Sequence, residues 1–166
     1  MKKLLMFGAI LLMIKQAAGT WTVETVATLS DTCKGVGLAL DSNNKPHIVY
    51  AQKTTLGDYV YEKYKDAGGT WQGPYSTNCA HNESMSPYGP WDCIGFDAKK
   101  DTFWAVTLYA LNSGSWPSYI FASYKDGISG TWSAYETIKS WTGTFPARFT
   151  ACDIVVESGR VVHLIY

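Results

Sequence analysis

The sequence lacks three features that would each assign it to a large class of proteins. It has no basic patch, because 14 lysine and arginine residues are matched by 14 acidic residues. Since phosphate binding needs clustered cationic side chains, nucleic acid is a poor candidate partner. The four cysteines form no C-x-x-C pair and the three histidines are scattered, so no zinc pattern is present and no cofactor is expected. No segment after the first twenty residues shows a helical stripe, which favours an all-β fold.

The one long apolar run lies at the N-terminus. Two lysines precede an apolar stretch over residues 4–14, and small residues follow at 17–19. This order predicts a secretory signal peptide over 1–19, too short to remain as a membrane anchor, rather than a buried N-terminal helix. The exported part, 20–166, keeps 11 basic residues against 14 acidic ones, a net charge of −3. We therefore expect a secreted or periplasmic protein, with no membrane partner after the signal is removed.

All four cysteines lie in the exported part, where an oxidising compartment permits disulfides. The candidates are Cys33, Cys79, Cys93 and Cys152. Four cysteines allow three pairings, and we expect Cys79 to pair with Cys93 because the two are near each other along the chain.

A short stretch occurs twice: "YKDAGGTW" at 64–71 and "YKDGISGTW" at 124–132. Just upstream, "DYVYEKYKD" at 58–66 matches "SYIFASYKD" at 118–126 without a gap, and both alternate with the two-residue period of a strand. His47 and His163 fall at equivalent positions of the alignment, with Val106 in the middle copy, which indicates a structural role in the repeat.

Each repeat unit begins at Thr-Trp, which defines units 20–69, 70–130 and a shorter unit 131–166. We predict four strands per unit, in the first unit at about 36–41, 46–51, 58–65 and 71–77. The connections between these strands are rich in turn-forming residues. A period of this length with four short strands is typical of a β-propeller or a related array.

The repeats resemble those of secreted bacterial β-propellers of the sialidase-like, BNR or Asp-box kind. The Asp-box pattern is Ser-x-Asp-x-Gly-x-Thr-Trp. It is matched here, with Tyr64 in place of the serine, by Asp66, Gly68, Thr70 and Trp71, and in a degenerate second copy by Asp126, Gly130, Thr131 and Trp132. The resemblance implies a β-propeller-type array of four-stranded antiparallel blades, with about two and a half blades present and the ring incomplete.

The box residues themselves indicate a structural role. An aspartate in a tight turn accepts hydrogen bonds from turn amides, glycine permits a positive φ, and tryptophan packs against the neighbouring sheet. Because the chain ends inside the repeat pattern, we expect either a fragment of a longer reading frame or copies that associate to complete a ring.

Antiparallel strands place the connections between units, and those between the second and third strands, at one end of the sheets. The longest of these connections, at 76–91, 110–117 and 139–149, carry the aromatic and polar side chains expected of a carbohydrate site. The ligand-binding candidates are Tyr88, Trp91, Trp116, Trp141 and Arg148. The alternative is that these rings only fill the core of the loops.

These features favour a secreted propeller module that recognises carbohydrate or another surface ligand without catalysis. An alternative is a glycoside hydrolase or polysaccharide lyase of the sialidase-like class whose site is completed by missing blades. For a lyase, His81 and Tyr88 could act as base and acid. For a hydrolase, Glu83 is the one glutamate in these loops and Asp92 is the nearest plausible second carboxylate. A sialidase needs an arginine cluster, whereas only Arg148 and Arg160 are present.

A second alternative is a structural repeat in a larger cell-surface protein. The expected partners are therefore a glycan or cell-surface ligand, together with the remaining blades of a longer chain or further copies of this one.

Overall fold

The computed structural model describes residues 11–12, 23–29, 33–54, 57–79, 93–109, 118–141, 153–158 and 161–165. Within these ranges every regular element is a β-strand. No helix in the described ranges is long and apolar enough to cross a membrane. The prediction of an all-β chain with four-stranded antiparallel sheets is confirmed.

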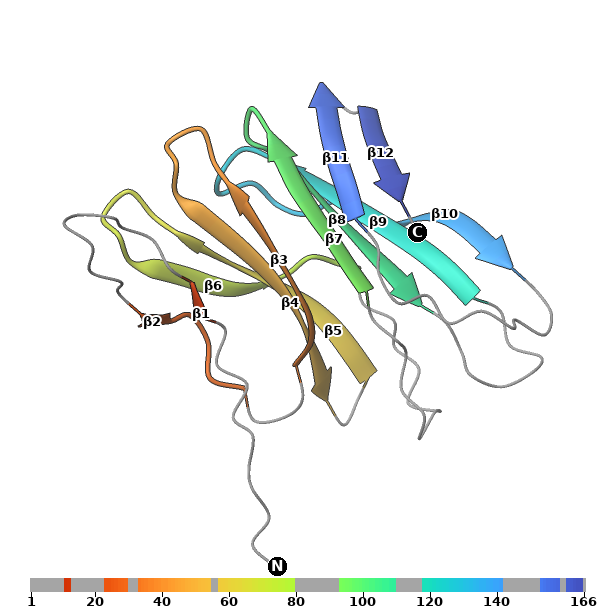
Figure 1. Ribbon diagram of the computed structural model, residues 1–166, viewed down its shortest axis with the longest axis horizontal. Helices are drawn as coiled ribbons and strands as arrows, with labels where there is room; N and C mark the ends of the chain where they lie inside the picture. The colour runs from red at the N-terminus through yellow and green to blue at the C-terminus, as the bar shows by residue number, and fades with distance from the viewer. Residues whose placement is uncertain are drawn as a thin grey trace, which may run out of the picture.

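Two sheets each contain four strands in sequence order (Figure 1). The first sheet consists of β3 (Cys33–Leu40), β4 (Pro46–Thr54), β5 (Gly57–Lys65) and β6 (Trp71–Ser76). The second consists of β7 (Cys93–Lys99), β8 (Thr102–Tyr109), β9 (Ser118–Asp126) and β10 (Glu136–Trp141). Alternating apolar residues and short turns therefore produce the strands close to where the sequence predicts them.

Two hairpin-sized pairs complete the described strands. β11 (Asp153–Ser158) pairs with β12 (Val161–Ile165) and stands where a third sheet begins. β1 (Leu11–Leu12) pairs with β2 (Glu24–Thr25), so the described part of the predicted signal peptide contacts the start of the exported part.

Successive sheets meet through their first strands. β3, β7 and β11 lie side by side and run in the same direction (Figure 1). A Cβ atom on Gly37 would stand 2.5 Å from Cβ of Phe96, and one on Gly95 would stand 2.8 Å from Cγ2 of Ile154. Glycine at these two positions allows the first strand of the next sheet to approach.

The largest hydrophobic cluster lies between the two four-stranded sheets. Val49 and Val60 of the first sheet face Phe96 and Phe103 of the second, and Trp132 completes the layer. A second cluster lies between the other face of the second sheet and Ile154 of β11. Burial of each large apolar side chain contributes roughly 1.5–3 kcal/mol, so these layers stabilise the stack of sheets.

The outer face of the first sheet is covered only in part. Residues 26–29 pack on Ile48 and Tyr50, and Lys63 Nζ donates a hydrogen bond to the Val26 carbonyl at 2.9 Å. The same face of β3 remains exposed, with Val36, Leu38 and Leu40 each about half accessible. The described residues form a stack of sheets and no closed ring.

The structure corrects one sequence equivalence. Gly37 and Gly95 occupy matching positions in β3 and β7. Two residues after each glycine, the strand pairs with His47 in the first sheet and with Trp104 in the second, and these two residues lie opposite Tyr64 and Tyr124. Trp104, rather than Val106, is therefore the counterpart of His47. The alignment was wrong because the hairpin at 41–45 has five residues whereas the one at 100–101 has two.

Candidate functional site: a buried polar cluster between the sheets

The first Asp-box turn is closed by hydrogen bonds to the Asp66 carboxylate. Asp66 Oδ1 accepts the backbone N–H of Thr70 at 2.8 Å, and Oδ2 accepts a hydrogen bond from Gln72 Nε2 at 2.7 Å. These bonds, with Thr70 contributing most, hold the pKa of the Asp66 carboxyl below its usual value. Asp66 therefore closes the turn between β5 and β6.

The glycines of the two boxes act differently from the prediction. Positive φ occurs at Gly69 and Gly127, both at 83°, and not at the box residues Gly68 and Gly130. A Cβ on Gly130 would overlap the carbonyl oxygen of Asp126, so this position needs glycine for space. In the second box, Asp126 Oδ1 accepts a hydrogen bond from Thr102 Oγ1 at 3.0 Å.

The repeated lysine and tryptophan make the same contact in both copies. Lys65 Nζ lies 5.7 Å from the ring centroid of Trp71 and 2.7 Å from Glu24 of the N-terminal segment. Lys125 Nζ lies 5.7 Å from the ring centroid of Trp132 and 2.7 Å from Glu62 of the first sheet. In each copy the repeat thus binds a glutamate of the layer that precedes it.

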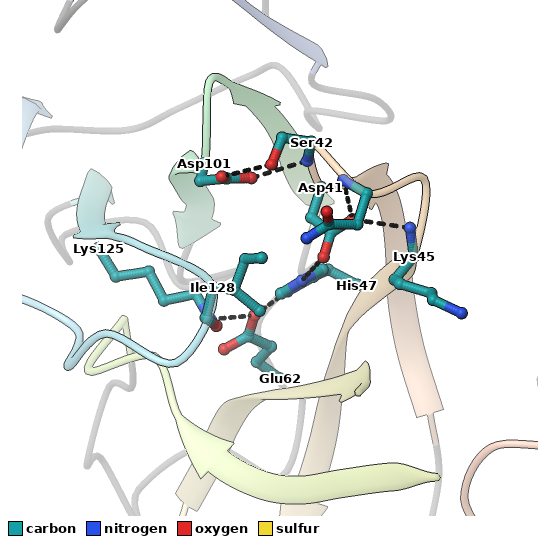
Figure 2. Close-up of polar contacts among 9 residues, drawn as sticks. Asp41, Ser42, Lys45, His47, Glu62, Asp101, Lys125 and Ile128 are labelled. Atoms are coloured by element: carbon teal, nitrogen blue, oxygen red, sulfur yellow. Dashed lines mark hydrogen bonds and ion pairs between the residues drawn. The ribbon is translucent and has the colours of Figure 1, made fainter. Parts of the chain in front are cut away.

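The second of these contacts is the centre of a buried cluster, defined here as His47, Glu62, Lys125 and Trp132. Figure 2 shows the first three of these residues. Glu62 Oε1 lies 2.7 Å from both His47 Nδ1 and Lys125 Nζ, and Glu62 Oε2 accepts the indole N–H of Trp132 at 2.9 Å. His47 and Glu62 come from the first sheet, Lys125 comes from β9 of the second, and Trp132 comes from the connection between β9 and β10, so the cluster joins the sheets.

Aromatic rings enclose the cationic side of the cluster. Lys125 Nζ lies 4.8 Å from the ring centroid of Phe103 and 5.1 Å from that of Tyr64, and it donates a hydrogen bond to the Ile128 carbonyl at 2.7 Å. The His47 ring stacks between the same two rings, at 4.1 Å from Phe103 and 5.1 Å from Tyr64. Cation–π contacts of this kind are strongest where water is excluded.

The environment favours the ionised form of Glu62. Burial alone would raise the pKa of this carboxyl, but the hydrogen bond from His47 and the charge and hydrogen bond of Lys125, with the bond from Trp132, outweigh burial and lower it. Burial lowers the pKa of Lys125, and Glu62 opposes that shift. A buried carboxylate with three donors is a stable arrangement only while all of its partners remain.

The hairpin at 41–45 closes the cluster toward its own end of the sheets (Figure 2). Asp41 Oδ1 accepts the backbone N–H groups of Asn43 and Lys45, while Asp41 Oδ2 lies 3.8 Å from His47 Nε2. Asp101 of the neighbouring hairpin accepts the backbone N–H and the hydroxyl of Ser42, both at 2.7 Å. The two hairpins are thereby held together across the sheet boundary.

The cluster is sealed from solvent. The side chains of His47, Glu62 and Lys125 are each at most 1% accessible. A substrate could not reach these groups in this conformation, so their arrangement supports the packing of the sheets and not acid–base catalysis. Within the described ranges no group of three or more His, Cys, Asp or Glu side chains could hold a metal ion.

The predicted disulfide between Cys79 and Cys93 is not formed in the structure, where Cys79 is a free buried thiol. Its Sγ faces the second sheet, 3.4 Å from the Ala105 carbonyl oxygen and 3.0 Å from Ser123 Oγ. Burial raises the pKa of Cys79 to about 11, although hydrogen bonds from Ser123 and its neighbours oppose the shift. Cys33 is also a free thiol, half-buried at the start of β3, and Cys152 lies outside the described residues.

Most of the predicted ligand-binding and catalytic residues lie outside the described ranges. These residues are His81, Glu83, Tyr88, Trp91, Trp116 and Arg148. β10 ends at Trp141, whose backbone lies opposite Ser118 of β9. The next residue of β9, Tyr119, lies opposite Tyr109 at the end of β8. The chain segments that carry the other candidates join strand ends at this same end of the second sheet.

Sequence reasoning missed the buried cluster. The signal was present, because Glu62 stands where the aligned copy has Ala122. The alternation of the strand did place Glu62 on the same face as Val60, which is the face that the second sheet covers.

Comparisons of the chain with protein-family models, with curated proteins and with solved structures find no match.

Proposed function

We propose that the chain is an exported, non-catalytic recognition module of the Asp-box β-propeller kind, and that its ligand is a carbohydrate or another surface ligand. The leader over 1–19 is the basis for export, and the repeated Asp boxes are the basis for the family. Three successive sheets that meet through parallel first strands are consistent with propeller blades around an axis.

The observation that carries the proposal is the difference between the two ends of the sheets. At one end the turn after β5 is closed by the hydrogen bond of Asp66 with Thr70, and two neighbouring hairpins are joined by Ser42 and Asp101. At the other end lie the long connections between the sheets, 77–92 from β6 to β7 and 142–152 from β10 to β11, together with the connection 110–117 from β8 to β9. Long connections on a rigid scaffold are where proteins most often place binding residues.

The composition of these long segments suits sugar recognition. Trp116 and Tyr88 offer flat rings for the apolar faces of a sugar, and Arg148 offers hydrogen bonds to hydroxyl or carboxylate groups. Trp141 lies at the described border of this end. We propose that Tyr88, Trp91, Trp116, Trp141 and Arg148 form the binding surface.

The buried cluster gives this surface a fixed support. Glu62 and Lys125 tie the third strands of two sheets together, so the strand ends keep one relative position. A preorganised surface loses less conformational entropy when it binds. The same cluster is inaccessible, and the chain has only two arginines, so a recognition role is favoured over hydrolysis or elimination.

A glycan-array screen of the purified chain tests the proposal. We expect binding to a restricted set of glycans and no change in the mass of the bound glycans after prolonged incubation. Cleavage of a bound polysaccharide would contradict a non-catalytic role. Absence of binding to all glycans and to cell surfaces would contradict recognition and favour a structural repeat.

A further inference from the structure

The first strands of the second and third units lie in a fixed register. Asp97 Oδ2 accepts the backbone N–H of Val156 at 2.8 Å. A Cβ atom on Gly95 would stand 2.8 Å from Cγ2 and 3.4 Å from Cγ1 of Ile154. Both contacts join residues 59 positions apart, 97 with 156 and 95 with 154. Because β7 and β11 run in the same direction, one offset describes the whole contact between them (Figure 1).

Two cysteines stand at the next step of this register. Cys93 lies two residues before Gly95, and 59 positions later in the sequence is Cys152, directly before β11. Side chains alternate between the two faces of a strand, so position 93 shares with Gly95 and Asp97 the face of β7 that is turned to β11. Continued by one residue, the alternation of β11 predicts position 152 on the face of Ile154, which is turned to β7.

The two strands are separated by the distance that a disulfide bridges. Cβ of Ile154 is bonded to both Cγ atoms that approach Gly95, so the two Cβ positions are roughly 4 Å apart. A disulfide joins Cβ atoms that are about 3.5–4.5 Å apart. The same strand separation two residues earlier lets two cysteines bond without movement of the backbone.

The other two cysteines lie in different layers of the stack. Cys33 packs with Tyr50 on the face of the first sheet that residues 26–29 cover. Cys79 is buried between the first and second sheets, where its Sγ lies 3.0 Å from Ser123 Oγ. The face of β7 that carries position 93 is the opposite one, turned to β11. Neither Cys33 nor Cys79 therefore competes for the register partner of Cys93.

The contact between the second sheet and β11 is built from different groups than the contact between the first two sheets. Ala122 stands at the position of Glu62 in the aligned copies, and it packs in an apolar cluster with Ile154. The carboxylate of the buried ion pair is thus replaced by a methyl group. A covalent bond between β7 and β11 would supply at the second contact the fixed attachment that Glu62 and Lys125 supply at the first.

We propose that Cys93 and Cys152 form a disulfide in the exported protein. The bond joins the ends of the two long connections between the sheets, 77–92 and 142–152, and fixes β11 to β7. When it forms, the two thiols lose two protons and two electrons to a disulfide oxidant of the oxidising compartment, which becomes a dithiol. Cys33 and Cys79 keep their thiols.

Peptide mapping and thiol titration of the full 166-residue chain test the proposal. The folded chain is equilibrated in a mixture of reduced and oxidised glutathione, blocked with iodoacetamide in denaturant, and digested. Trypsin alone leaves Cys79 and Cys93 in one peptide, 66–99, so chymotrypsin is added to cut between them after Tyr88 or Trp91. We expect one linked pair of peptides, which carries Cys93 and Cys152 and separates on reduction. Two of the four cysteines should react with iodoacetamide.

Single variants separate this pairing from the others. Cys93→Ser and Cys152→Ser each free the partner thiol, so three thiols should react and no linked peptides should form. Cys33→Ser, at a half-buried position, is the matched control and should keep the linked pair with one reactive thiol. A link between any other two cysteines, a link only between separate chains, or four reactive thiols in the wild type would each overturn the proposal.

The result does not depend on glycan recognition. Oxidation of the purified chain needs neither a glycan nor export, so failure of the proposed function would leave the mapping unchanged. Failure of the pairing would in turn leave the glycan array as the test of recognition.

Discussion

Lys125 Nζ of β9 lies 2.7 Å from Glu62 Oε1 of β5, so one buried ion pair joins the third strands of two successive sheets. The equivalent pair one layer earlier, Lys65 with Glu24, has the same separation but is partly exposed. The lysine of each repeat, beside the repeated tryptophan, thus joins its sheet to a glutamate of the layer before it.

Removal of the buried carboxylate should strongly destabilise the fold. We expect Glu62→Ala to lower the free energy of unfolding by about 3–5 kcal/mol, because Lys125 would remain as an unpaired buried charge. The measurement is urea unfolding followed by tryptophan fluorescence. Lys65→Met is the matched control, since its pair is 24% and 43% accessible and is worth about 1 kcal/mol or less. An equal loss of unfolding free energy in both variants would contradict the claim that the ion pair of Glu62 matters more because it is buried.

Stability should fall in acid partly through Glu62. Its pKa in the folded protein lies below the ordinary value of 4.5, so the unfolded chain binds more protons between the two values. The contribution of Glu62 is complete above about pH 4.5 and is lost as the pH falls through the folded-state pKa. Unfolding free energies measured across this range should decline less steeply for Glu62→Gln than for the wild type. Parallel slopes would show that Glu62 does not titrate in this way.

The close approach of the sheets makes Gly37 intolerant of a side chain. Gly37→Ala places a methyl group 2.5 Å from Cβ of Phe96 and should cost about 1–3 kcal/mol through overpacking. Leu38→Ala, at the neighbouring exposed position, should change stability by about 0.5 kcal/mol or less. Thermal unfolding of the two variants measures the difference. A neutral Gly37→Ala variant would mean that β3 and β7 do not lie this close.

The Cys79 thiol should be unreactive in the folded protein. With a pKa of about 11 it is almost wholly protonated near neutral pH, and the thiolate is the reactive form. Alkylation with iodoacetamide followed by peptide mapping should modify Cys79 only after unfolding, while the half-buried Cys33 reacts faster. Recovery of a disulfide-linked Cys79–Cys93 peptide from the exported protein would instead restore the pairing expected from the sequence.

Much of the fold could be predicted because local signals and the fold agree. The alternation around Tyr59 to Tyr64 and the turn residues at 66–70 set the strand positions, and the structure has β5 and the following turn there. The role of Asp66 followed from turn chemistry. The register of the second sheet could not be predicted from the alignment of the repeats. Its hairpin has only two residues, Lys100 and Asp101, so that Trp104 has the position in the second sheet that His47 has in the first.

The buried cluster could not be predicted because it depends on contacts between distant residues. Glu62 and Lys125 are separated by one whole repeat unit, and nothing in either strand alone shows that they meet. A charge inside an apolar strand signals an unseen partner, but the partner is determined by how the sheets stack. The same limit applies to Cys79, whose nearest groups, Ala105 and Ser123, lie on other strands.

The proposed recognition surface is tested most directly by the affinity for a glycan that the array identifies, measured by isothermal titration calorimetry for three variants. Trp116→Ala and Trp141→Ala remove rings from the proposed surface, and Tyr135→Ala removes a half-exposed ring near the Asp-box turns as a control. We expect each tryptophan variant to bind at least tenfold more weakly, which corresponds to about 1.4 kcal/mol, and the tyrosine variant to bind like the wild type. Unchanged affinity in both tryptophan variants would contradict recognition at the loop end of the sheets.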